Sequence, residues 1–82
     1  MYHLYILECT DGSLYTGITN DVERRFVKHK EGKGGRYTRA KGVVRIVYTE
    51  ACSDKSAALK REAQVKKMSR EAKESLIHGW KI

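Results

Sequence analysis

The feature that most limits the fold is a pair of strand-forming runs near the N-terminus, separated by a turn signal. Residues 2–9 read YHLYILEC and residues 13–18 read SLYTGI, with Thr-Asp-Gly between them. Aromatic and branched residues on both sides of a short glycine-containing segment predict a β-hairpin. The three-residue loop predicts a type I turn with Gly12 in the left-handed conformation of a bulge. We therefore expect the chain to begin with two antiparallel strands.

The register of this hairpin decides which side chains share a face. With a three-residue loop, Tyr5 opposes Gly17 and Tyr15 opposes Leu7, so both tyrosines lie on one face and Gly17 leaves space beside the Tyr5 ring. A two-residue Asp-Gly turn instead places the tyrosines on opposite faces. Either tyrosine is alternatively an ordinary strand residue with its hydroxyl in solvent. In the first register the other face is filled by Leu4, Ile6, Leu14 and Ile18.

The middle of the chain predicts a helix, a loop and a third strand. Asn20 followed by Glu23 resembles a capping box and predicts a helix to about residue 30. Residues 31–42, EGKGGRYTRAKG, are glycine-rich and basic and predict a loop that a phosphate could approach closely. Residues 43–50, VVRIVYTE, alternate between two faces and predict a strand.

The last third of the chain predicts two helices. Ser53 or Asp54 caps the first, which runs to about residue 68, and Ser69 caps a shorter one that ends at Gly79. The second of these helices packs its apolar side against the rest, with Leu76, Ile77 and Trp80. No repeat is present, and 82 residues predict a single domain over residues 1–82.

Charge points to a polyanionic partner. The 17 lysines and arginines against 10 aspartates and glutamates give a net charge of +7 and an isoelectric point near 9.6. A basic domain of this kind binds phosphate backbones electrostatically, and the alternative is a basic protein with no such partner.

Several classes are excluded by the same sequence. Apolar runs are only a few residues long and the N-terminus lacks a charged start and a cleavage site, so we expect neither a membrane span nor secretory export. Cys9 and Cys52 have no neighbouring cysteine at metal-ligand spacing, and two cysteines make a poor disulfide framework. We therefore expect reduced thiols and a cytoplasmic location.

The first predicted helix carries charged side chains on its apolar stripe. Val22, Arg25, Phe26 and His29 follow the spacing of one helical face, so Arg25 and His29 share the side that the apolar residues bury. A guanidinium there can grip a phosphate in bidentate fashion, and an imidazole one turn away can pass a proton. The alternative is a packed histidine and an arginine whose stem alone is buried.

The second predicted helix carries a single carboxylate, Glu62, on a face that it shares with Ala58, Leu59 and Val65. A charge in that position is costly unless it is paired or used. Lys66 four residues on is the ordinary partner. A hard cation such as Mg²⁺, which needs only one or two carboxylates and a substrate phosphate, is the alternative.

Together these residues resemble the GIY-YIG nuclease family, in order and approximate spacing, over nearly the whole chain. The motifs are His3-Leu4-Tyr5, Tyr15-Thr16-Gly17, Arg25, His29 and Glu62. The chain is most similar to short stand-alone bacterial members, which share YTGITNDVERR and the Gly-Lys-Gly loop. The resemblance implies an α+β fold, a small three-stranded antiparallel sheet flanked by helices, with one active site on its face.

The resemblance also implies roles for these positions. Tyr5, Tyr15, Arg25 and His29 match catalytic residues, Glu62 matches the metal-holding glutamate, and Gly17 matches the glycine of the second motif. Lys33, Arg36 and Arg39 would hold flanking backbone. The implied activity is a structure-tolerant endonuclease that uses Mg²⁺ or Mn²⁺ on nucleic acid, DNA more than RNA, in DNA repair.

Three departures keep other functions open. His3, Leu4 and Thr16 replace family glycine and isoleucines, no late asparagine is present, and 82 residues leave no room for a separate DNA-binding domain. One alternative is a nucleic-acid-binding or adaptor module that needs a protein partner for targeting. Another is a small RNA-associated protein whose tyrosines stack on bases.

Overall fold

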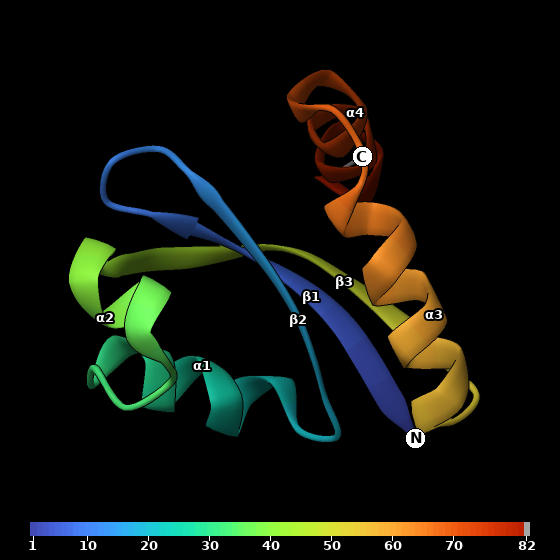
Figure 1. Cartoon of the computed structure of the whole chain (residues 1–82), viewed down its shortest axis with the longest axis horizontal. Helices are drawn as coiled ribbons and strands as arrows, with labels where there is room; N and C mark the ends of the chain where they lie inside the picture. Colours follow the sequence, from blue (N-terminus) through green and yellow to red (C-terminus); the bar gives the residue numbers. More distant parts are fainter. Residues whose placement is uncertain (82) are drawn as a thin grey trace.

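The computed structural model describes residues 1–81 and places one antiparallel sheet between two pairs of helices (Figure 1). The strand order is β2-β1-β3, so β1 is central. The strands are β1 (Tyr2–Cys9), β2 (Leu14–Thr19) and β3 (Val43–Cys52). The helices are α1 (Val22–Lys30), α2 (Arg36–Lys41), α3 (Lys55–Lys66) and α4 (Arg70–Lys81). The predicted α+β class and three-stranded sheet are confirmed.

The hairpin register is the one that the three-residue loop predicts. Tyr5 pairs with Gly17 and Leu7 pairs with Tyr15. Gly12 has a φ of 85°, in the left-handed region, and its N–H donates to the Cys9 carbonyl at 2.9 Å. Both tyrosines therefore lie on one side of the sheet, which we call the tyrosine face.

The opposite side of the sheet, the apolar face, builds the main core against α3 and α4. Leu4 and Ile6 of β1 are fully buried there with Val47 of β3 and Val65 of α3. Partly buried apolar residues complete this core, namely Leu14, Ile18, Tyr48, Met68, Leu76 and Ile77. The helices α3 and α4 cover the apolar face, and α1 and α2 lie against the tyrosine face (Figure 1).

Helix starts follow short polar side chains, with one correction. Asp21, not Asn20, caps α1, because its carboxylate accepts from the Arg24 N–H at 3.1 Å. Asp54 caps α3 by accepting from the Ala57 N–H at 2.8 Å. The Ser69 hydroxyl accepts from the Ala72 N–H at 3.1 Å, as expected for the last helix.

Two predicted boundaries are wrong. The segment 31–42 is not all loop, because α2 occupies residues 36–41 between Gly35 and Gly42, which have φ values of 144° and 76°. No side chain caps α2, so its contacts with the tyrosine face hold it in place. Gly79 does not end the last helix, which continues to Lys81, because a glycine weakens a helix without having to stop it.

Two packing details also differ from the sequence pattern. The simple alternation of the third strand is broken, because the β1–β3 register shifts between Ile6 and Leu7 and Val47 turns into the core. A bulge of this kind puts two residues of one strand opposite one of the other. Leu59 does not share the buried face of α3, since 48% of it is exposed.

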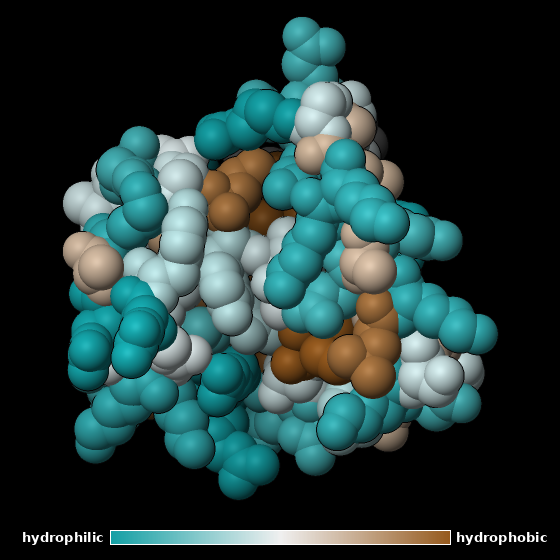
Figure 2. All heavy atoms as spheres, viewed as in Figure 1, coloured by the Kyte–Doolittle hydropathy of each residue, from teal (hydrophilic) through white to brown (hydrophobic). Residues whose placement is uncertain are grey.

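The surface is mainly hydrophilic. In the view of Figure 2, polar and charged residues cover most of the molecule and leave two small apolar patches near the centre. Within residues 1–81, no helix has the length and apolar character needed to cross a membrane. Cys9 and Cys52 are free and buried, and they lie at opposite ends of β1 and β3, with Cys9 opposite Val43 and Cys52 opposite Tyr2.

Thr16 is a buried polar residue on the apolar face. It is 4% exposed, it pairs with Ile6 across the hairpin, and its hydroxyl has no hydrogen-bond partner. We expect Thr16→Val to raise the free energy of unfolding by about 1 kcal/mol, because an apolar group of the same shape replaces an unsatisfied hydroxyl. Urea denaturation measures this change.

The matched control for this substitution is Thr19→Val. The Thr19 hydroxyl accepts from the Asp21 N–H at 3.1 Å, so its removal should lower stability. A loss of stability in Thr16→Val as large as that in the control would show that the Thr16 hydroxyl has a partner.

Candidate active site

Tyr5 lies at the centre of the tyrosine face. Its side chain is 2% exposed, and its hydroxyl lies 3.0 Å from Nε2 of His29 on α1. Gly17 on the neighbouring strand makes this position possible, because a Cβ there would lie 2.5 Å from the Tyr5 hydroxyl oxygen. The space that the sequence predicts at Gly17 is thus filled by the side chain of Tyr5.

His29 is fully enclosed by the helical layer. It is 1% exposed, and its Nδ1 lies 2.7 Å from the hydroxyl of Thr38 on α2, which is also 1% exposed. Gly34 passes directly over the imidazole, where any Cβ would overlap the ring. The sequence interpretation missed Thr38, and it read Gly34 as part of the glycine-rich basic loop. No local sequence pattern marks Thr38 as part of the site.

Aromatic rings surround this hydrogen-bonded pair. The Tyr15 ring centroid lies 5.2 Å from that of His29 and 6.4 Å from that of Tyr5. Tyr37 on α2 continues the cluster 5.8 Å from Tyr15 and is 42% exposed. The sequence did not indicate Tyr37, because the segment that carries it was predicted to be a loop.

Arg25 borders the cluster from α1, one turn before His29. Its side chain is half-buried, and its Nη2 donates to the Gly34 carbonyl at 3.0 Å. Its guanidinium is also near enough to Tyr5 to favour the ionised form of that hydroxyl. Arg25 therefore ties the glycine segment to α1 and places a positive charge beside the tyrosine.

Burial sets the protonation states of the central pair. Burial raises the pKa of Tyr5, and Arg25 offsets only part of this effect. Burial also lowers the pKa of His29, and the charge of Arg25 lowers it further. In the ligand-free protein, the effect of burial on the Tyr5 pKa outweighs that of Arg25. At neutral pH Tyr5 is therefore a phenol and His29 a neutral imidazole.

Glu62 belongs to the other helical layer. Its side chain is 20% exposed, and its carboxylate lies 3.4 Å from Nζ of Lys66, the ordinary partner considered from sequence. Its charge nevertheless contributes to raising the pKa of Tyr5, as the weakest of five effects. Glu62 therefore acts on the cluster electrostatically, and no hydrogen bond joins it to the cluster.

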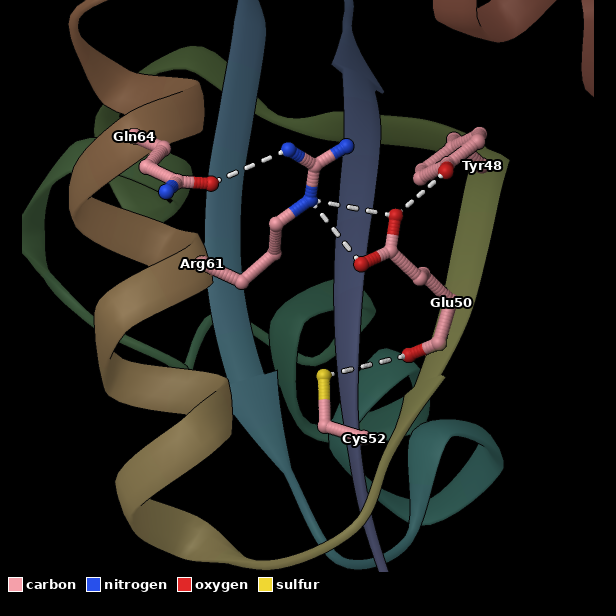
Figure 3. Close-up of polar contacts among 5 residues, drawn as sticks. All are labelled: Tyr48, Glu50, Cys52, Arg61 and Gln64. Carbon is pink, nitrogen blue, oxygen red and sulfur yellow. Dashed lines mark hydrogen bonds and ion pairs between the residues drawn. The ribbon is translucent and has the colours of Figure 1, made fainter.

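The residue before Glu62 fixes α3 to the sheet (Figure 3). Arg61 Nε lies 2.9 Å and 3.2 Å from the two carboxylate oxygens of Glu50 on β3. Tyr48 donates to the same carboxylate at 2.7 Å, and Arg61 Nη1 donates to Gln64 at 3.2 Å. Both members of the ion pair are 28% exposed, so it is partly shielded from water. This contact orients the helix that carries Glu62.

The side chains of this site can hold a metal ion only if waters and a substrate supply the remaining ligands. Among residues 1–81, no three histidines, cysteines or carboxylates come close enough together to hold a metal ion. A single partly exposed carboxylate is still suited to Mg²⁺ or Mn²⁺, which take the remaining ligands from waters and substrate phosphates. Glu62 is such a carboxylate, with only a side chain of its own helix as partner.

Basic side chains line two hollows beside the cluster. Lys33, Arg36 and Arg39 are exposed and line one hollow of about 280 Å³ with Gly32 and Gly35. The second, of about 270 Å³, lies where β2 leads into α1. Its lining is Thr19, Asn20, Asp21, Arg24, Arg25 and Lys28. The sequence indicated the first set of cations and missed Lys28.

The structure thus brings most of the candidate residues together. Tyr5, Tyr15, Gly17, Arg25 and His29 form one cluster, as the predicted hairpin register and helix stripe require. A buried tyrosine–histidine pair thus lies beside an arginine on a three-stranded sheet, with a carboxylate on a later helix. The chain belongs to the GIY-YIG family, since the family model of the GIY-YIG catalytic domain matches residues 1–75.

The chain is also similar to several small proteins over almost its whole length. It is 46% identical to a UPF0213 protein of Halobacterium salinarum, over 94% of this chain and 100% of that protein. It is 47% identical to one of Staphylococcus saprophyticus, over 93% of each. The solution structure of a UPF0213 protein from Bacillus halodurans is 51% identical and has a TM-score of 0.60, over 95% of this chain and 84% of the other.

Proposed function

We propose that the protein is a cytoplasmic metal-dependent endonuclease that hydrolyses phosphodiester bonds in nucleic acid, DNA more than RNA. One observation carries the proposal. A buried tyrosine hydroxyl lies 3.0 Å from the Nε2 of a buried histidine, beside an arginine that lines one of the two basic hollows. Membership of the GIY-YIG family supports nuclease chemistry at this site.

In this proposal, Arg25 binds the scissile phosphate and stabilises the charge that develops on it. Lys33, Arg36 and Arg39 hold the flanking backbone through the first hollow. Tyr15 packs against both Tyr5 and His29 and limits the access of bulk water to them. These residues orient the substrate without reading its bases, which agrees with a structure-tolerant enzyme.

Tyr5 activates the attacking water through His29. Because burial raises the pKa of Tyr5, its hydroxyl is protonated in the free protein. It can accept a proton from water only while it gives its own proton to a neighbouring base. Water gives a proton to the Tyr5 oxygen while the Tyr5 proton moves to His29 Nε2. The water oxygen bonds to phosphorus, the bond to the 3′ oxygen breaks, and that oxygen takes a proton from solvent. His29 then returns its added proton to solvent, which restores the neutral imidazole.

Glu62 is the residue that would hold the metal. A bound Mg²⁺ or Mn²⁺ would supply positive charge that neutralises the phosphate and the leaving group. To bind the cation, the Glu62 carboxylate must give up its ion pair with Lys66. That exchange costs little, because the pair is an i,i+4 contact whose lysine is 54% exposed.

Cleavage of labelled nucleic acids tests the proposal. The substrates are single-stranded, duplex, flapped and branched DNA together with RNA, each with Mg²⁺, Mn²⁺ or EDTA. We expect cutting that requires the metal and that is greater on DNA than on RNA. Cutting that persists in EDTA would contradict metal dependence.

A binding or adaptor module without turnover is the second candidate. The Glu62–Lys66 ion pair favours it, because the one candidate metal ligand already has a partner. Such a module should show salt-dependent binding and no cutting in the same experiment. It should also lose affinity when Arg36 or Arg39 is neutralised, and a protein that supplies targeting should then co-purify with it.

A further inference from the structure

His29 has a defined hydrogen-bond partner at each ring nitrogen, and both partners are hydroxyl groups. Nε2 lies 3.0 Å from the Tyr5 hydroxyl and Nδ1 lies 2.7 Å from the Thr38 hydroxyl. A neutral imidazole carries one proton, so one nitrogen donates and the other accepts. Which nitrogen accepts decides whether His29 can take a proton from Tyr5.

The Thr38 side of this chain favours a proton on Nδ1. The Thr38 hydroxyl has a single proton, and it donates to the Gly35 carbonyl three residues earlier at 3.5 Å. Threonine hydroxyls in helices commonly donate to a carbonyl three or four residues back. The lone pairs of the Thr38 oxygen are then left to accept from Nδ1–H.

The Tyr5 side favours the same tautomer independently. The Arg25 guanidinium has only donors, and it lies close enough to the Tyr5 oxygen to stabilise negative charge on it. Within residues 1–81 the Tyr5 hydroxyl, which is 2% exposed, forms its hydrogen bond with Nε2 of His29, so its one proton is directed toward that nitrogen. Nε2 must accept that proton, which again leaves the imidazole proton on Nδ1.

We propose that Thr38 is a positioning residue that fixes the tautomer of His29 and so turns the Nε2 lone pair toward Tyr5. The inference rests on the proposed function, in which His29 receives the Tyr5 proton. With the other tautomer, Nε2–H donates to Tyr5 and cannot take its proton. In this proposal Thr38 acts through His29, to which its hydroxyl is hydrogen-bonded, and not on the substrate.

This role also explains why the chain forms the short helix α2 at this position. The helix has six residues and no side-chain cap, and its buried residue is Thr38. Gly34 and Gly35 bring the chain over the imidazole, and Gly42 ends the helix with a φ of 76°. The glycine-rich segment thus forms a short helix that places the Thr38 hydroxyl beside Nδ1 of His29.

Nitrogen-15 NMR of the imidazole rings tests the tautomer directly. The chain has three histidines, so the variants His3→Gln and His78→Gln assign the signals of His29 by elimination. In the wild-type protein we expect a protonated Nδ1 and an unprotonated Nε2 at neutral pH. Thr38→Ser should keep this pattern, and Thr38→Val should reverse it. An unprotonated Nδ1 in the wild type, or an unchanged pattern in Thr38→Val, would overturn the proposal.

Cleavage kinetics then connect the tautomer to the reaction. We expect Thr38→Val to lower kcat about 10- to 100-fold with little change in KM, as for other residues that orient a catalytic histidine. Thr38→Ser should recover most of kcat. A reversed tautomer with wild-type kcat would overturn the positioning role. If the wild type cuts nothing, the proposed function fails, while the NMR result still decides whether Thr38 sets the tautomer.

Discussion

Replacement of Glu62 by glutamine should reduce metal-dependent cleavage by about 10²- to 10³-fold, which is the usual cost of removing one group that stabilises the transition state. Glutamine keeps the size of the side chain but loses the charge that would attract Mg²⁺ or Mn²⁺. The fold should be unaffected, because Glu62 forms only an i,i+4 pair with Lys66 at 3.4 Å. Single-turnover cleavage and a binding assay, run in parallel, separate turnover from affinity.

Glu71→Gln provides a matched control for this variant. Glu71 is an exposed carboxylate on α4, on the following helix, and removing its charge changes the net charge of the protein by the same amount. We expect cleavage by Glu71→Gln to equal that of the wild type. Equal loss in both variants would attribute the effect to net charge, and equal cutting by Glu62→Gln and the wild type would rule out Glu62 as the metal ligand.

Gly17→Ala should damage both the site and the fold. The added methyl group would lie 2.5 Å from the Tyr5 hydroxyl oxygen and 2.7 Å from its ring carbon Cζ, so the ring must move. Overpacking of this kind costs about 1–3 kcal/mol of stability. Displacement of Tyr5 also breaks its hydrogen bond to His29, and a shift of about 1 Å can cost about 10²-fold in rate.

Urea denaturation and cleavage measured on the same preparation test this prediction, with Gly79→Ala as its control. Gly79 lies in α4, and among residues 1–81 no atom other than those of the adjacent residues and the helix backbone lies within 4 Å of the position that a Cβ would take there, so alanine should add a methyl group without a clash. That variant should gain up to about 1 kcal/mol from helix propensity and keep wild-type cleavage. Wild-type cleavage by Gly17→Ala would show that the Tyr5–His29 contact is not needed.

The sequence predicts the hairpin and its register because a three-residue loop leaves only one arrangement of the two strands. That register puts Tyr5 opposite Gly17, and the stripe of the first helix puts Arg25 and His29 on its buried side. Local rules decide these features: loop length, period of the apolar residues and pairing across a hairpin. The cluster of five residues follows from them.

The missed features depend on contacts between distant segments. Nothing local marks residues 36–41 as helical, since α2 begins at an uncapped glycine and is held by Thr38 on His29 and Tyr37 on Tyr15. The bulge in β3 that buries Val47 likewise arises from pairing with β1. Sequence patterns carry no signal for such tertiary contacts, so Thr38 and Tyr37 could be found only in three dimensions.

The ion pair between Arg61 and Glu50 stabilises a part of the fold that is distinct from the tyrosine–histidine cluster (Figure 3). It attaches α3 to β3 on the apolar face, whereas the tyrosine, histidine and threonine of the hydrogen-bonded chain are held by α1 and α2 on the other face. Small units of a fold can open locally while the rest stays closed. If Glu62 holds the metal as proposed, opening of α3 would withdraw it and leave the residues that line the basic hollows in place, giving a form that binds nucleic acid without hydrolysing it.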